Sequence, residues 1–237
     1  MPLYAMGDLH LSLSVDKPQD KFPGWENYIE RIDKNWRAIV NEDDTVVLCG
    51  DISWAMKLGE TALDFAFIND LPGQKLVVKG NHDYWWTTKT KMDRYLSDSG
   101  FSTIEILFNN SYVYGNTVIC GTRGWSYDCA GEEDLKVLAR ECGRLKLSLD
   151  SAARLKGDRL IVMMHYPPMN ERFEDSTFTA LVEPFAPCDL IYGHLHGASF
   201  REAFNGMRNG VRYTCAACDG LRFRLADLTE AVPSDRE

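Results

Sequence analysis

The sequence lacks any long apolar run. Its apolar segments are short, and a segment such as 160–164 falls far below the roughly 20 residues that a membrane-spanning helix needs. No basic stretch precedes the apolar residues 2–6, and Gly7-Asp8 interrupts that run almost at once. We therefore expect no signal peptide, no membrane association and a cytoplasmic location.

An excess of positive charge is also missing. The 237 residues include 26 Lys and Arg against 35 Asp and Glu, which gives a net charge of -9. Such a chain has no broad electrostatic footprint for nucleic-acid backbones or anionic membranes, so nucleic acid is not an expected partner. The hydrophobic content of 45% and aromatic content of 11% exclude a disordered or fibrous chain and allow a full core.

The cysteines show no disulfide framework. There are seven, an odd number, and they spread from Cys49 to Cys218 without framework spacing. Several lie within apolar runs, which predicts free, buried thiols in a reducing compartment. Cys215 and Cys218 form a CxxC, but they lie in an expected strand with no second pair. We expect buried thiols there rather than a zinc or redox site.

Short apolar runs alternate with helical patterns early in the chain and cluster late. This order favours a layered α/β domain over a purely parallel doubly wound sheet. No linker, repeat or low-complexity stretch interrupts it, so we expect one domain over residues 1–237. The expected strands are 2–6, 44–49, 74–79, 104–108, 112–120 (a hairpin), 159–164, 188–192, 211–217 and 221–226. The expected helices are 25–40, 60–70, 87–98, 132–155 and 177–185.

Five polar clusters each follow an expected strand, and together they contain all five histidines. Ligands of layered α/β sheets bind at the carboxyl ends of strands, so these clusters can converge. Glycine at the start of four of these clusters allows a sharp turn. The single residue between Asp8 and His10, and likewise between His194 and His196, predicts that each pair lies on one face of extended backbone. The clusters are Gly7-Asp8-Leu9-His10, Gly50-Asp51-Ile52-Ser53, Gly80-Asn81-His82-Asp83, His165-Tyr166-Pro167-Pro168 and Gly193-His194-Leu195-His196.

The side chains in these clusters have the chemistry of metal ligands. A lone histidine is more often a core or surface residue, but here none lies on an expected exposed helix. Imidazole with carboxylate and amide oxygen suits Mn, Fe, Zn or Ni. Seven ligands are too many for one ion, so we expect two divalent or mixed-valence transition-metal ions that share a carboxylate. The candidate ligands are Asp8, His10, Asp51, Asn81, His165, His194 and His196.

The series GD-x-H, GD, GNHD, H-x-P and GH-x-H resembles the calcineurin-like metallophosphoesterase superfamily, and it spans residues 7–196. The resemblance implies a four-layer α/β/β/α sandwich of two mixed sheets flanked by helices, with the site at one edge of the sheets. It also implies that Asp51 bridges two ions. One ion would be held by Asp8, His10, Asp51 and His196, and the other by Asp51, Asn81, His165 and His194.

The resemblance further implies a metal-dependent phosphoester hydrolase. Two cations about 3.5–4 Å apart would activate a hydroxide that attacks the phosphoryl group. In the family pattern His82 protonates the leaving alkoxide, and we expect the neighbouring Asp83 to hold its ring. The Asp-Arg-Gly segment of the protein Ser/Thr phosphatase branch is absent after Asp51, which favours a small phosphomonoester or phosphodiester as substrate. Arg123 is either a substitute phosphate-binding cation or a solvated loop residue.

Two other functions stay open at this stage. A nuclease would require a basic groove and usually an appended domain, and a non-catalytic metal-binding scaffold would show eroded ligands. Specificity is expected from loops 11–24 and 121–131, although the long loop 11–24 has a functional and a purely structural explanation of about equal weight. Trp85-Trp86 either wall the substrate site or pack the following helix on the sheet. Substrate, diester preference and oligomeric state are not readable from the sequence.

Overall fold

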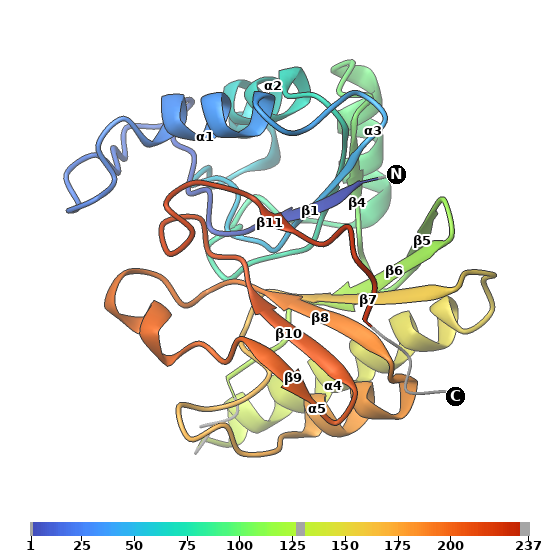
Figure 1. Cartoon of the computed structure of the whole chain (residues 1–237). Coiled ribbons are helices and arrows are strands. Elements are labelled where there is room, and N and C mark those ends of the chain that lie inside the picture. Colours follow the sequence, from blue (N-terminus) through green and yellow to red (C-terminus); the bar gives the residue numbers. More distant parts are fainter. Residues whose placement is uncertain (1, 127–130, 233–237) are drawn as a thin grey trace.

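Two β-sheets pack face to face, and helices cover the outer face of each sheet (Figure 1). The computed structural model describes residues 2–126 and 131–232. Helices α1, α2 and α3 cover the first sheet, and α4 and α5 cover the second (Figure 1). The predicted four-layer α/β/β/α sandwich is confirmed.

The elements follow the expected order closely. The strands are β1 (Leu3–Met6), β2 (Thr45–Leu48), β3 (Gln74–Val77), β4 (Ile104–Ile106), β5 (Ser111–Tyr114), β6 (Thr117–Thr122), β7 (Arg159–Met164), β8 (Cys188–Tyr192), β9 (Gly206–Arg208), β10 (Val211–Cys215) and β11 (Ala226–Asp227). The α-helices are α1 (Tyr28–Arg37), α2 (Ala62–Asp70), α3 (Lys89–Asp98), α4 (Glu132–Ala152) and α5 (Thr177–Val182). Short 3₁₀ helices are η1 (Leu58–Thr61), η2 (Glu183–Phe185) and η3 (Gly197–Glu202).

Both sheets are mixed. The first has the order β11-β1-β2-β3-β4, in which β1 to β4 are parallel and β11 is an antiparallel edge. The second has the order β5-β6-β7-β8-β10-β9, with a parallel centre and antiparallel edges at β5 and β9. Because the central strands are parallel within each sheet, their carboxyl ends gather at one edge of that sheet.

Alternating side chains of the central strands fill two different layers of the core. In β2, Val46 packs toward the helices, while Val47 packs between the two sheets. In β7, Val162 faces the helices of the second sheet and Met163 faces the other sheet. Strands buried on both faces are apolar at every position, which explains why they read as continuous apolar runs in the sequence.

Residues 221–226 do not form the expected strand. Arg222 and Phe223 have φ angles of 55° and 60°, which no strand accommodates, and the segment turns instead. Phe223 is buried against the helix side of the first sheet, so its apolar character reflects packing rather than strand formation. After this turn, a short strand of two residues, Ala226–Asp227, pairs with the free edge of β1. Strand β9 was not expected, because Gly206-Met207-Arg208 is too short to show a pattern.

The prediction of free, buried thiols is confirmed for most cysteines in the described part of the chain. Its six cysteines are free, and five of them, Cys215 and Cys218 included, are buried. The seventh, Cys129, lies outside the described residues. Trp85 is buried and packs edge-on against Phe65, so it packs a helix as one interpretation required, although this helix is the preceding α2 and not the following α3. No helix among the described residues has the length and apolar character to cross a bilayer.

A buried ion network lies near the start of three neighbouring strands. The carboxylate of Asp189 on β8 is fully buried. It accepts hydrogen bonds of 3.0 and 2.7 Å from Arg159 on β7 and of 2.6 Å from Nε of Arg212 on β10. The buried carboxylate attracts both guanidinium groups and separates them, and removal of its charge would leave two cations facing each other.

We expect Asp189→Asn to lower the free energy of unfolding by about 3 kcal/mol, because the largely buried Arg159 and Arg212 would lose the negative charge between them. Asp93→Asn is the matched control: it breaks the surface ion pair with Lys89 and should cost under about 1 kcal/mol. Urea denaturation of both variants measures the difference. Equal losses would contradict a stabilising role for the buried network.

Candidate metal centre

The predicted ligands meet where the carboxyl ends of strands from both sheets come together. Asp8, Asp51 and Asn81 follow β1, β2 and β3 of the first sheet, while His165 and His194 follow β7 and β8 of the second. Donor atoms of Asp8, Asp51 and His165 lie within 4.8 Å of one another, and all three side chains are buried. The site therefore lies across the junction of the two sheets.

The carboxylate of Asp51 lies at the centre of the cluster. Its Oδ2 is 3.7 Å from Nε2 of His10 and 3.6 Å from Nε2 of His165. Its Oδ1 accepts a hydrogen bond of 2.7 Å from the backbone N–H of His82, which fixes the orientation of the carboxylate. One carboxylate oxygen thus faces imidazole nitrogens from both sheets, as a shared ligand would.

On one side of Asp51, an amide oxygen and two imidazole nitrogens crowd together. Oδ1 of Asn81 is 2.6 Å from Nε2 of His165 and 2.9 Å from Nδ1 of His194, and the two nitrogens are 3.2 Å apart. Nδ1 of His165 is 2.9 Å from the carbonyl of Cys49, so it carries the proton, and burial lowers the pKa of this ring to about 3. Its Nε2 therefore presents a lone pair to the amide oxygen. A cation in contact with both atoms would remove their repulsion.

On the other side of Asp51, one buried donor atom has no partner. Nε2 of His10 makes no hydrogen bond to any described residue, although the side chain is only 3% exposed. The ring of His196 meets the ring of His10 edge-on, with ring centroids 5.3 Å apart.

The carboxylate of Asp8 accepts hydrogen bonds of 3.0 and 2.9 Å from the N–H of His194. Burial, and next the charge of Asp51, raise the pKa of Asp8. Nitrogen and oxygen donors with uncompensated charge fit divalent cations.

The backbone at the site is left-handed rather than extended. Asp8, His10, Asp51 and His194 have φ angles of 58°, 46°, 53° and 70°. The prediction that Asp8 and His10, and likewise His194 and His196, share a face of extended backbone is therefore wrong. Aspartate and histidine tolerate this region better than branched residues, and such conformations concentrate at functional sites.

Glycines of the motifs act mainly through close approach. A Cβ on Gly80 would lie 2.1 Å from Oδ1 of Asp51, and one on Gly193 would lie 2.6 Å from Oδ2 of Asp8. Only Gly50, with a φ of 85°, also provides the sharp turn that the sequence predicted. The absent side chains leave room for the carboxylates.

The structure does not pair Asp83 with the ring of His82 as the sequence predicted. Asp83 is buried, and its carboxylate accepts hydrogen bonds from the N–H groups of Asp51, Ile52 and Gly80 and from Nε1 of Trp85. Burial, together with the charge of Asp51, raises the pKa of Asp83 to about 7. This side chain holds the backbone that carries Asp51. The ring of His82 instead has Nδ1 3.3 Å from the hydroxyl of Tyr84.

The backbone of Arg123 contacts the cluster of ligands, because its carbonyl accepts a hydrogen bond of 3.0 Å from the N–H of His165, but its guanidinium has partners of its own. Its guanidinium is 3.2 Å from the buried carboxylate of Glu141 and stacks at 4.6 Å on the ring of Trp125. With 14% of its side chain exposed, it is not the solvated loop residue that one interpretation required. Its guanidinium is paired with Glu141, and the role of a substitute phosphate-binding cation stays a prediction. Residues 127–130 of the second expected specificity loop lie outside the described residues.

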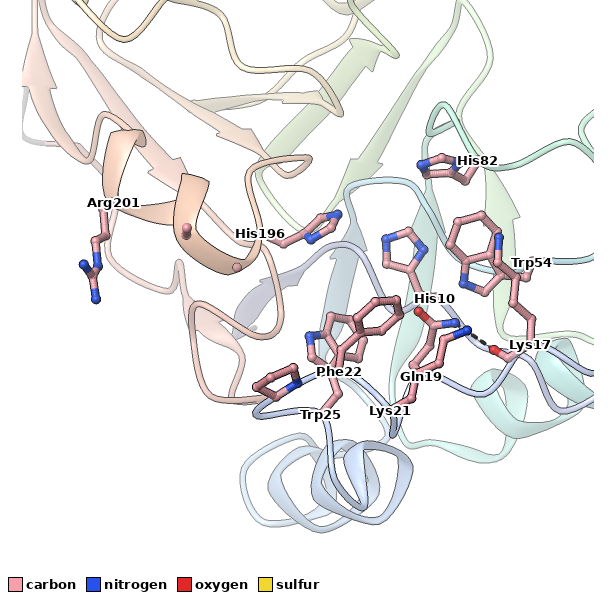
Figure 2. Close-up of a pocket in the computed structure, with 13 residues that line it drawn as sticks. His10, Lys17, Gln19, Lys21, Phe22, Trp25, Trp54, His82, His196 and Arg201 are labelled. Carbon is pink, nitrogen blue, oxygen red and sulfur yellow. Dashed lines mark hydrogen bonds between the residues drawn. The ribbon is translucent and has the colours of Figure 1, made fainter.

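A cavity of about 820 Å³ opens beside His10, His82 and His196, and Figure 2 shows their rings turned toward one another. Loop 11–24 supplies five of its lining side chains, among them Lys17. Nζ of Lys17 lies 2.9 Å from the ring centroid of Trp54, which stacks on His10. Sequence reasoning missed Lys17 and Trp54, because an isolated lysine or tryptophan has no pattern. The length of the loop was the available signal.

Known proteins similar to this chain share its motifs or its fold. The model of the calcineurin-like phosphoesterase family matches residues 1–198. The Gene 66 protein of Mycobacterium phage L5 is 38% identical over 58 residues, which are 24% of this chain and 28% of that protein. The match thus spans less than a third of this curated relative.

Two solved structures superpose over nearly the whole chain. TT1561 of Thermus thermophilus has a TM-score of 0.59 at 13% identity, and the match covers 98% of this chain and 99% of that one. Phosphopantetheinyl hydrolase (PptH) from Mycobacterium tuberculosis has a TM-score of 0.53 at 14% identity, with coverage of 100% and 97%. At these identities the likeness shows the fold alone.

Gly80→Ala should displace Asp51, because the new Cβ would overlap Oδ1 and the backbone nitrogen of that residue. We expect bound metal, measured by elemental analysis after purification with Mn, to fall by more than about tenfold. Gly59→Ala, where a Cβ meets nothing within 4 Å, is the control and should keep its metal. Full metal content in Gly80→Ala, with a circular dichroism spectrum like that of the unaltered protein, would count against the centre.

Proposed function

Since the chain belongs to the calcineurin-like phosphoesterases, we propose that it hydrolyses a phosphomonoester or phosphodiester of a small molecule with the help of bound metal ions. One observation carries the proposal. Nitrogen and oxygen ligand atoms that follow four other strands gather around the buried carboxylate of Asp51, and Nε2 of His10 has no hydrogen-bond partner among the described residues. A set of this kind has no evident structural purpose without cations.

We assign the ligands by their position around Asp51, which would be shared by two ions. When bound, divalent cations here would polarise the phosphoryl oxygens and make water nucleophilic near neutral pH. The first ion would be held by Asp8, His10, Asp51 and His196. The second would be held by Asp51, Asn81, His165 and His194. Manganese, iron, zinc and nickel all suit these donors.

His82 is the residue that we assign to the leaving group. It lines the cavity beside His10, and its backbone N–H is fixed on Asp51. The hydroxyl of Tyr84 meets Nδ1, so Nε2 is the atom left to give a proton to the departing oxygen. Tyr84 takes the orienting role first expected of Asp83. General acids of this kind raise the rate of reactions with poor leaving groups by about 10²–10⁴-fold.

Purified protein should hydrolyse bis(p-nitrophenyl) phosphate, p-nitrophenyl phosphate or both when Mn, Ni, Fe or Zn is supplied in turn. Chelation should abolish the activity, and addition of metal should restore it. Asp51→Asn should lose more than about 100-fold in kcat/KM, since it weakens the ligand that both ions share. Equal rates with every metal and with chelator, and no bound metal by elemental analysis, would refute the proposal.

His82→Ala should keep its metal content, because the ring is not among the assigned ligands. We expect kcat/KM on alkyl phosphoesters, whose leaving oxygen needs a proton, to fall by about 10²-fold or more. The loss on p-nitrophenyl esters should be much smaller. Tyr84→Phe should show the same selectivity for ester type, with a smaller loss of kcat/KM. An equal loss on both ester types would remove His82 from the role of acid.

A further inference from the structure

The cavity beside the metal centre is much larger than a phosphoryl group. Its volume of about 820 Å³ falls in the range of sites for whole small molecules. His10, His82 and His196 form its inner end, so an ester held at the metal centre would extend its organic part into this space (Figure 2). The lining side chains should therefore reflect the chemistry of that organic part.

The charge of the lining is opposite to that of the chain. Lys17, Lys21 and Arg201 contribute cationic groups, and no acidic side chain among the described residues lines the cavity. The chain as a whole carries a net charge of -9, so the overall composition does not explain the excess of positive charge in the cavity lining. A cavity with three cations favours a ligand that has negative charge beyond the phosphoryl group at the metal centre.

An exposed aromatic ring lies next to one of these cations. Phe22 is 48% exposed, and the ammonium of Lys21 lies 5.4 Å from its ring centroid. Trp25 beside it is buried and packs edge-on against Phe223, which supports the apolar wall from behind. Phe22 thus offers a flat apolar face within reach of Lys21. A ligand with an aromatic ring and an anionic group close together would match this pair.

Loop 11–24 is held in place at several points. The N–H of Leu13 donates to Asp64 of α2 at 2.7 Å, and Asp20 accepts from the N–H of Asn27 at 3.0 Å. The buried amide of Gln19 donates to the carbonyl of Lys17 at 2.7 Å, the bond drawn in Figure 2. A loop fixed in this way presents its side chains without a large ordering cost on binding.

The two lysines of the loop lie at different depths in the cavity. Lys17 lies over Trp54, whose other neighbours are His10 and His82, so its charge faces the end near the metal centre. Lys21 lies beside Phe22 on the wall that the loop forms. An elongated ligand could therefore place one anionic group near Lys17 and another near Lys21.

We propose that the substrate is a nucleotide-type phosphoester, in which a flat ring and a second anionic group accompany the scissile phosphate. Phe22 takes the ring, Lys21 takes the second anionic group, and Lys17 faces the phosphate beside the histidines. The proposal rests on the proposed function, because that function places the scissile phosphate at the inner end of the cavity.

A competition assay tests this assignment. Ribose 5-phosphate, adenosine 5′-monophosphate and adenosine 3′,5′-bisphosphate share one phosphate and add first a ring and then a second anionic group. Each competes with the p-nitrophenyl ester that the metal-loaded protein hydrolyses, and its inhibition constant is measured. We expect the constant to fall by about fivefold or more with the ring and by about tenfold with the second phosphate.

Two variants test which side chain is responsible for each gain in affinity. Phe22→Ala should remove the gain from the ring, and Lys21→Gln should remove the gain from the second phosphate. Both side chains are exposed, so neither change threatens folding. Lys146→Gln on the exposed face of α4 is the matched control and should keep both gains. Equal inhibition by all three ligands, or gains that survive in both variants, would overturn the substrate class while hydrolysis itself stands. Absence of any hydrolysis would overturn the proposed function and with it this inference.

Discussion

Burial of two aspartate carboxylates side by side is the constraint on which the rest of the site depends. Asp8 and Asp51 are 0% and 1% exposed, and each charge opposes ionisation of the other. Backbone N–H donors compensate only part of this cost, because burial of an ionised carboxylate costs more free energy than a few hydrogen bonds return. The polar atoms crowded around Asn81, and the nitrogen of His10 that has no hydrogen-bond partner among the described residues, add to this imbalance. Divalent cations are the simplest agents that would correct all of these at once.

The fold makes this arrangement possible because it aligns the strand ends of two separate sheets. Each sheet alone carries an incomplete set, with carboxylates, an amide and the imidazole of His10 on the first and the remaining imidazoles on the second. The side chain of Asp83 then supports the first set by collecting backbone N–H groups around Asp51. Glycines at the motif positions let the two sets approach each other within van der Waals distance. Rigid elements therefore hold the ligands, as a precise metal geometry requires.

Local patterns made much of this predictable. Strands buried on both faces appear as apolar runs, and each ligand block follows one of them, so the layers and the convergence could be inferred from residue order. Long-range contacts could not. The backbone donors that occupy Asp83, and the partner Glu141 that holds Arg123, depend on side chains distant in sequence. The φ angle of Asp8 was equally hidden, because aspartate gives no local sign of a left-handed conformation. Loop 11–24 showed only its length.

The bond between the N–H of His194 and the carboxylate of Asp8 joins residues 186 positions apart in the chain. Cations bound at the same place would connect these distant segments much as a cross-link does, closing a loop that contains most of the polypeptide. Occupancy of the centre would then contribute to the free energy of folding of the whole sandwich as well as to chemistry at one edge. A supply of metal during synthesis would accordingly affect how much folded protein accumulates, quite apart from how fast each molecule turns over.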